Sequence, residues 1–301
     1  MNVTFRQLKV FEAVARLLSY TNAAKELYLT QPAVSMQIKQ LEENAGLPLL
    51  EQIGKKIYLT EAGTEMYHYA RKMAQELNET SSIMEQLKGL ETGRLEVTVA
   101  TTANAFATRM LSKFNKEHEG STVSLDVTNR EHLLRQLADN EKDIAIMGRP
   151  PEDADLVTEP FADNPLVVVA APDHPLVGVQ PIPLYMLQDQ TFVVREKGSG
   201  TRTAMQRFFE EHNLSITSSM EMNENEAIKQ AVQAGMGLGV VSIHTIELEL
   251  ETKRLVILDV EDFPIMRHWY LVHRKEKRLS PITQAFKDFV LSEGRNLIPH
   301  I

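Results

Sequence analysis

A glycine-rich segment near residue 200 has the composition of an anion-binding loop. The run KGSGTR (residues 197–202) directly precedes a predicted helix, Arg202–His212. Its glycines, Gly198 and Gly200, allow backbone N–H groups to face a ligand, and the hydroxyls of Ser199 and Thr201 add donors. The helix N-terminus contributes about half a positive charge, and Arg202 could bind a carboxylate or phosphate through two parallel hydrogen bonds. An ordinary strand-to-helix loop is the alternative. The P-loop pattern GxxxxGK[ST] is missing, so nucleotide hydrolysis is not predicted.

Further polar side chains follow predicted strands in the same part of the chain. The strand Leu95–Ala100 is followed by Thr101, Thr102 and Asn104; the strand Val123–Thr128 ends with Thr128 and Asn129; the strand Ile144–Met147 is followed by Arg149. Ligands of parallel sheets bind outside the carboxyl ends of the strands. These residues could therefore converge with Ser199, Gly200, Thr201 and Arg202 on one cleft. For Thr102 and Asn104, simple helix capping is the alternative.

Catalytic and metal-binding patterns are weak. The nine histidines show no HExxH spacing, no GxSxG occurs, and the chain has no cysteine. We interpret Glu247, Glu249 and Glu251 as solvated surface, and Met220 and Met222 as core residues of a strand. The sequence predicts a protein that is not an enzyme and has no metal or cofactor, only a small-molecule ligand.

Residues 19–42 have the spacing of a helix-turn-helix. A short helix, Thr21–Leu27 with Thr21 as its cap, precedes a second helix, Gln31–Leu41, capped by Thr30. The second helix carries a buried stripe at i, i+4 and i+7 and an opposite face suited to bases and phosphates. An arbitrary polar face of a small helical bundle is the alternative. The predicted DNA-binding residues, including a basic strand or wing after the helices, are Thr30, Gln31, Pro32, Ser35, Met36, Gln37, Lys39, Lys55 and Lys56.

A long helix is predicted to follow, from about Thr60 to Leu90. Apolar positions recur at alternating steps of four and three along it, with one polar member: Met66, Ala70, Met73, Leu77, Thr80, Met84 and Leu87. A repeat of about 3.5 residues implies a partner helix, most simply the same helix of a second subunit. The alternative is a core helix of a larger domain.

The remainder alternates strands and helices and predicts an α/β fold with a largely parallel sheet. Two such units, joined by two crossing strands, indicate two lobes that close on a cleft. We predict three domains: 1–60, a winged helix-turn-helix; 61–92, a coiled-coil linker helix; and 93–301, an effector-binding domain. In the last, lobe I covers about 93–162 and 267–301 and lobe II about 163–266.

Composition and charge agree with this division. The 301 residues carry a net charge of −9, yet residues 1–60 contain seven basic and five acidic residues. This asymmetry permits DNA binding by the N-terminal part.

No apolar stretch approaches the about 20 residues of a membrane span, and no secretory signal opens the chain. We expect a cytoplasmic protein without membrane partners.

The run NAAKELYLTQPAVSMQIKQLEENAGLPLLEQIGKKIYLTEAG (residues 22–63) resembles the DNA-binding domain of the LysR-type transcriptional regulators nearly position by position. The resemblance extends over essentially the whole chain, including the linker helix and the two-lobed C-terminal domain of the periplasmic-binding-protein type. Two departures are Leu50, where many members carry Phe, and Gln52, where many carry Arg. The second removes a phosphate contact that Lys55 or Lys56 could supply.

Further segments, among them VREKGSGTRTAM and NEAIKQAVQAGMGLGVVSIHT, look like the CbbR/RbcR branch, which regulates Rubisco and Calvin-cycle operons. The resemblance implies a dimer of dimers, an imperfect palindromic site on double-stranded DNA, RNA polymerase as a partner, and an anionic effector in the cleft. Ribulose bisphosphate, phosphoenolpyruvate and NADPH are the implied effectors. A regulator of another operon is the first alternative. A binding protein or enzyme on a periplasmic-binding fold is the second, but it would have no use for residues 1–60.

Overall fold

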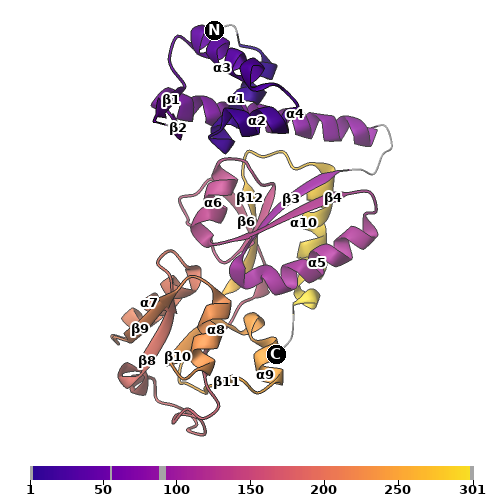
Figure 1. The fold of residues 1–301 in the computed structure, drawn as a ribbon. Coiled ribbons are helices and arrows are strands. Elements are labelled where there is room, and N and C mark those ends of the chain that lie inside the picture. Colours follow the sequence, from indigo (N-terminus) through magenta and orange to yellow (C-terminus); the bar gives the residue numbers. More distant parts are fainter. Residues whose placement is uncertain (1–2, 55, 88–92, 299–301) are drawn as a thin grey trace. The chain divides into compact units, whose positions relative to one another are not determined.

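The computed structural model describes residues 3–54, 56–87 and 93–298. The chain divides between residues 87 and 88 into two compact units, apart from the turn 139–141 (Figure 1). Lys55, one of the predicted wing residues, and the end of the predicted linker, 88–92, lie outside the described residues. In the described ranges, no helix is long and apolar enough to cross a membrane.

The N-terminal unit contains four helices and a two-stranded hairpin. Its elements are α1 (Phe5–Leu17), α2 (Tyr20–Glu26), α3 (Gln31–Ala45), β1 (Leu50–Ile53), β2 (Lys56–Leu59) and α4 (Glu61–Leu87). The predicted stripe of Val34, Ile38 and Leu41 is buried against α1 and α2. One capping prediction was wrong: Ser19, and not Thr21, accepts a backbone N–H at the start of α2, because that helix begins one residue earlier.

The seam predicted on the long helix faces two environments. Ala70 is buried and Met66 partly buried within the core of the same unit, so these positions pack as the core-helix alternative proposed. Further along α4, Met73, Leu77 and Met84 are 47%, 49% and 51% exposed. Large apolar side chains at this spacing leave an unpartnered stripe on the C-terminal half of the helix; the side chain of Leu87 is outside the described residues.

Lobe I of the second unit is a five-stranded sheet with the order β4-β3-β5-β12-β6. Its strands are β3 (Arg94–Ala100), β4 (Thr122–Thr128), β5 (Ile144–Met147), β6 (Leu156–Asp163) and β12 (His268–Arg274), and its helices are α5 (Asn104–Glu117), α6 (Arg130–Ala138) and α10 (Pro281–Glu293). Strands β3, β4 and β5 run parallel, as predicted. The sequence analysis missed β6, an edge strand in which Pro160 and acidic residues interrupt the apolar pattern.

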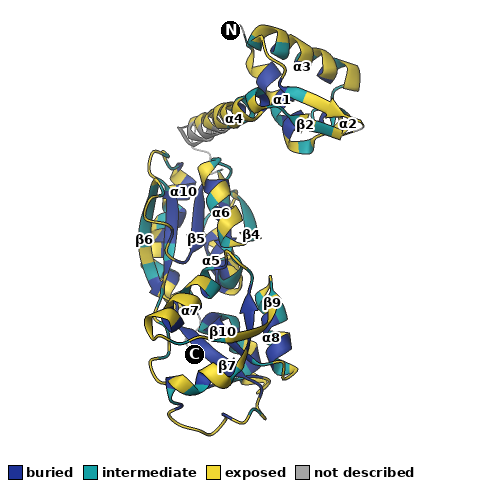
Figure 2. Cartoon of the chain, turned by 90° about the vertical axis from the view of Figure 1, so that its left-hand side faces the viewer, coloured by how far each residue is buried: buried dark blue, intermediate teal, exposed yellow. Residues whose placement is uncertain are grey.

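Lobe II is a second five-stranded sheet, with the order β11-β7-β10-β8-β9. Its strands are β7 (Leu166–Ala170), β8 (Thr191–Arg195), β9 (Thr217–Met222), β10 (Leu238–Ser242) and β11 (Val256–Ile257), and its helices are α7 (Gly200–Glu211), α8 (Asn225–Gln233) and α9 (Glu247–Glu251). Short 3-10 turns occur at η1 (Thr101–Ala103), η2 (Leu184–Asp189), η3 (Ile243–Thr245) and η4 (Gly294–Leu297). The inner strands β7 and β10 are buried along their whole length (Figure 2).

Two sequence interpretations in lobe II were wrong. Met220 lies on the edge strand β9 and is 36% exposed, so it is not a core residue. Glu249 is buried, and its Oε1 lies 2.8 Å from Nζ of Lys229. The alternation of glutamates in 247–251 suggested a solvated face, but α9 packs one of them inward beside a lysine of α8.

Two extended segments connect the lobes. Leu166 and Ile265 pair in an antiparallel bridge, and the backbone N–H of Asn164 donates to the carbonyl of Arg267 at 2.7 Å. These crossings place Asn164 and Arg267 at the junction of the two sheets.

Candidate functional site

The exposed face of α3 carries the polar residues predicted to contact DNA. Thr30 caps the helix by accepting the backbone N–H of Ala33, and Gln31, Pro32, Ser35, Met36 and Lys39 are exposed, whereas Gln37 is half-buried. Gln31, Ser35 and Lys39 follow one another at intervals of four and so share one face. Lys39 lies 3.9 Å from Glu43, a weak, fully solvated pair that leaves its ammonium group accessible.

A wing follows α3. Strands β1 and β2 pair antiparallel, and Gly54 at their turn has φ of +65°, a left-handed conformation that favours glycine. Lys56 opens β2 and is exposed. Gln52, where many family members carry Arg, turns its side-chain amide onto the carbonyl of Gly54 at 3.0 Å and so helps to close the turn.

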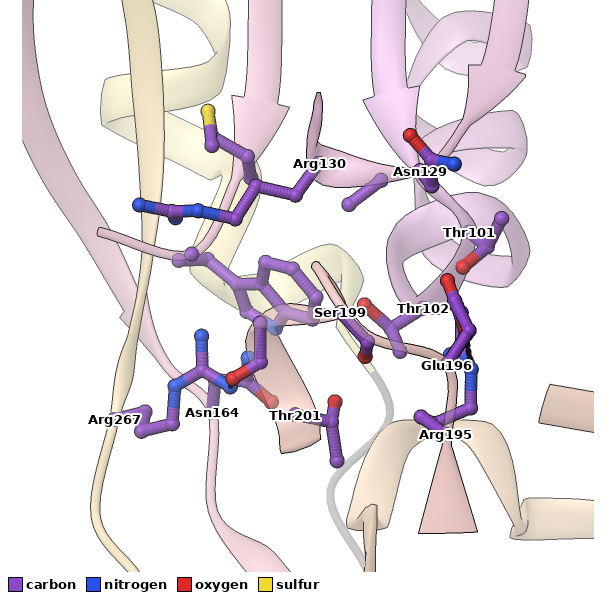
Figure 3. Close-up of a pocket in the computed structure, with 15 residues that line it drawn as sticks. Thr101, Thr102, Asn129, Arg130, Asn164, Arg195, Glu196, Ser199, Thr201 and Arg267 are labelled. Atoms are coloured by element: carbon purple, nitrogen blue, oxygen red, sulfur yellow. Dashed lines mark hydrogen bonds and ion pairs between the residues drawn. The ribbon is translucent and has the colours of Figure 1, made fainter. Parts of the chain in front are cut away.

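A pocket lies between the two lobes of the second unit, at the carboxyl ends of β3, β4, β5 and β8 (Figure 3). The space between its lining residues is about 420 Å³ when the open, solvent-filled mouth is included. Of the predicted effector-binding residues, Thr101, Thr102, Asn129, Ser199, Gly200 and Thr201 line it. The prediction from strand ends therefore identified lining residues in both lobes.

Two arginines give this pocket its charge. Arg130, at the start of α6, donates to the carbonyl of Arg149, and Arg267 donates to the carbonyl of Gly200 at 3.1 Å. Within the described chain, no carboxylate pairs with either guanidinium. Burial lowers the pKa of Arg130; burial and the neighbouring charge of Arg130 lower the pKa of Arg267 to about 10. Two like charges in a partly desolvated pocket favour the binding of an anion.

Two glycines, which have no side chain, leave room for the guanidinium group of Arg267. A Cβ on Gly148, which follows β5, would lie 2.2 Å from Nη2 of Arg267, and a Cβ on Gly200 would lie 3.4 Å from the same atom. Gly148 belongs to lobe I and Gly200 to lobe II. The guanidinium group of Arg267 therefore occupies space that neither lobe fills with a side chain.

Uncharged hydrogen-bonding groups also line the pocket. Ser199 is the N-cap of α7, but its hydroxyl does not bond to the helix, so the first-turn N–H groups of α7 stay available near the pocket. On the facing lobe, Thr101 and Thr102 form the turn η1 before α5. Asn129 caps α6 by accepting the N–H of His132 at 2.9 Å.

Four predicted effector-binding residues lie elsewhere. Arg202 was predicted to grip the ligand, but its guanidinium donates to the carbonyl of Arg195 at 2.8 Å and pairs with Glu221 of β9. One helical step from Thr201 rotates its side chain away from the pocket. Arg149 is exposed and pairs with Glu152 at 2.7 Å. Asn104 is exposed on α5, and Thr128 does not line the pocket.

The sequence analysis missed several lining residues. Besides Arg130 and Arg267, these are Ala100, Met147, Gly148, Asn164, Arg195, Glu196 and Trp269. Arg130 directly follows Asn129, so the strand-end rule could have found it. Arg195 is saturated by Glu196 at 2.7 and 3.1 Å, by the carbonyl of Asn223 and by Asn225. Arg267 and Trp269 enter from the last strand of the chain, and no local pattern marks them.

Two family descriptions match the chain. Residues 5–64 match “Bacterial regulatory helix-turn-helix protein, lysR family”, and residues 88–295 match “LysR substrate binding domain”. A full-length CbnR bound to its target DNA is 20% identical with a TM-score of 0.69, and it covers 96% of this chain and 99% of its own. This likeness confirms the predicted fold of a helix-turn-helix domain followed by a two-lobed α/β domain.

More similar relatives also include transcriptional regulators. A RuBisCO operon transcriptional regulator of Allochromatium vinosum is 56% identical, over 99% of this chain and 98% of its own length. A regulator of Rhodospirillum rubrum, CbbR, is 46% identical, over 96% of each chain. The regulatory domain of Synechocystis CcmR, solved in complex with 2-PG, is 46% identical with a TM-score of 0.66, covering 68% of this chain and 98% of its own. The chain belongs to the LysR family of bacterial transcriptional regulators.

Proposed function

We propose that this regulator controls Rubisco or other Calvin-cycle genes and that a small phosphorylated metabolite is its effector. The similarity to Rubisco-operon regulators over nearly the whole chain supports the target genes. The 2-PG complex of the related CcmR domain supports the chemical class of the effector. In this proposal the protein binds its effector without transforming it, and it acts in the cytoplasm.

The observation that carries the effector proposal is the pair Arg130 and Arg267. Both guanidinium groups line the pocket, and among the described residues they are bonded only to backbone carbonyls. Burial and the charge of Arg130 lower the pKa of Arg267. A phosphate group carries close to two negative charges near neutral pH and accepts several charge-assisted hydrogen bonds. It would offset both charges at once, and the free N–H groups at the start of α7 would add donors.

Recognition of DNA would use the exposed face of α3, with Gln31 and Ser35 on base edges and Lys39 and Lys56 on phosphates. The exposed stripe of Met73, Leu77 and Met84 on α4 would pair two chains. Two recognition helices would then read the half-sites of an imperfect palindrome, and a dimer of dimers would form through the C-terminal domains.

Regulation would follow from the position of the pocket between lobes. A ligand bound to Arg130 and Thr101 of lobe I and to Ser199 and Thr201 of lobe II favours the lobe arrangement in which all four groups reach it. The change in lobe orientation would alter the assembly on DNA and so the access of RNA polymerase to the promoter.

A promoter-binding experiment tests this function. DNA from upstream of the Rubisco genes, labelled and mixed with the full-length protein, should shift at lower protein concentration than random DNA of the same length. Ribulose bisphosphate, phosphoenolpyruvate or 2-PG should change the footprint length. Equal binding to Rubisco, unrelated and random fragments would refute the assigned target. Binding to another operon's promoter alone would favour a different pathway.

A further inference from the structure

One hydrogen bond behind the pocket joins the two lobes. Trp269 of β12, in lobe I, lines the pocket and is only 1% exposed. Its indole Nε1–H donates to Nδ1 of His244, at 3.2 Å, in the turn η3 of lobe II. His244 is itself buried but does not line the pocket. His244, which does not line the pocket, is therefore bonded to Trp269, which does.

The surroundings of this bond restrict both rings. Phe106 of α5 packs edge-on against Trp269, with the ring centroids 5.1 Å apart, and against His244 at 6.2 Å. A buried indole N–H needs an acceptor, because leaving it unpaired is costly. The orientation of the indole is thus tied to the position of η3 in lobe II.

The same strand carries the charge of the pocket. Arg267 stands two residues before Trp269, and alternate side chains of an extended segment point to the same side. Both residues line the pocket, together with Arg130 and Ser199. A shift of Trp269 would change the wall against which a ligand held by these arginines rests.

We propose that His244 is a positioning residue for effector binding: by accepting the indole N–H it fixes Trp269 as the inner wall of the pocket and links lobe II to that wall. This inference rests on the proposed function, in which the pocket binds a phosphorylated metabolite. The bond requires an unprotonated Nδ1, so the imidazole carries its proton on Nε2. His244 acts on the ligand only through Trp269.

Three variants of the full-length protein test the link. His244→Asn keeps an acceptor near the place of Nδ1, His244→Leu keeps an apolar volume without the acceptor, and Trp269→Phe removes the donor. Titration calorimetry with 2-PG, ribulose bisphosphate and phosphoenolpyruvate measures affinity. We expect His244→Leu to bind about tenfold more weakly and His244→Asn to stay within about twofold of the wild type. The double variant His244→Leu/Trp269→Phe should bind no more weakly than the weaker single variant.

A spectroscopic readout separates positioning from simple stability. The chain contains one tryptophan, so with excitation at a wavelength that tyrosine does not absorb, a ligand-induced change in emission reports Trp269. This change should shrink in His244→Leu and persist in His244→Asn. If His244→Leu fails to fold, Trp269→Phe and His244→Asn carry the test: weaker binding in the first and near-normal binding in the second support the proposal.

Two results would overturn the inference: unchanged affinity in both His244→Leu and Trp269→Phe, or an equal loss in His244→Asn and His244→Leu. A wild-type protein that binds none of the three phosphorylated compounds would instead contradict the proposed function. The two failures are therefore distinguishable in one set of titrations.

Discussion

The recognition face of α3 and the pocket between the lobes assemble their residues in different ways. Gln31, Ser35 and Lys39 lie on consecutive turns of one helix, and they are exposed as the helical repeat predicts. The lining of the pocket comes from segments between Ala100 and Trp269, in both lobes. A local repeat determines the first surface, whereas the second forms only when the tertiary fold brings distant segments together.

Two arginines illustrate this difference. Arg202 lies in a motif that suggests anion binding, yet its side chain supports the end of β8 and pairs with Glu221. Arg267 lies in an unremarkable stretch before β12, yet it reaches the pocket through the space left by Gly148. The sequence motif predicted a loop that does line the pocket, but Arg202, the cation predicted with it, is not a lining residue, whereas Arg267 is.

The largest effect is expected on α4, where apolar periodicity and the exposure of Met73, Leu77 and Met84 define the stripe. Met73→Glu with Leu77→Glu would place like charges in the exposed apolar stripe, and burying unpaired charge costs about 3–5 kcal/mol. Analytical ultracentrifugation of the full-length protein should show a smaller assembly than that of the wild type, because the contact between chains through α4 is lost. His68→Glu, at an exposed position of the same helix outside the stripe, is the control. Unchanged assembly in the double variant would show that the stripe is not the interface.

The next largest effect concerns Arg267. Arg267→Gln should weaken binding of a phosphorylated effector by about 1.5–3 kcal/mol, the range for a lost bond to a charged group. The lowered pKa of Arg267, about 10, means that the folded state disfavours its charge. The melting temperature without ligand should therefore stay the same or rise at pH 7. A variant that binds the effector normally would remove Arg267 from the site.

A smaller effect is expected at the DNA face. Gln31→Ala or Ser35→Ala should weaken specific binding by about 1–2 kcal/mol and leave binding to random DNA unchanged, because base contacts carry sequence information. Lys39→Ala should weaken both equally, since phosphate contacts do not depend on sequence. Gel shifts with specific and random fragments measure both. If Gln31→Ala and Lys39→Ala behave alike, α3 does not read bases as proposed.

The smallest effect is expected for Arg202. Arg202→Gln removes an ion pair with a half-exposed glutamate and a bond to the carbonyl of Arg195, neither of which faces the pocket. Effector affinity should fall by less than about 1 kcal/mol, the usual size of such a pair. Calorimetry under the conditions used for Arg267→Gln gives the comparison. A loss as large as that of Arg267→Gln would restore the motif-based assignment.

Much of the fold followed from the sequence because it depends on local patterns. The stripe of Val34, Ile38 and Leu41 and the parallel strands β3, β4 and β5 lie where apolar periodicity predicts them. The edge strand β6 was missed because Pro160 and acidic residues mask its pattern. In the site, residues at strand ends were found, but Trp269 and Arg267 were not, since they meet the pocket only after the chain has crossed between the lobes twice.

The position of a bound phosphate group tests the central claim most directly. We would crystallise the protein with 2-PG and locate the phosphate in the pocket. Phosphate oxygens about 2.7–2.9 Å from guanidinium nitrogens of both Arg130 and Arg267 would confirm that these two residues supply the charge. A phosphate bound to Arg202 or Lys197 instead, with Arg130 and Arg267 still bonded only to backbone carbonyls, would contradict it.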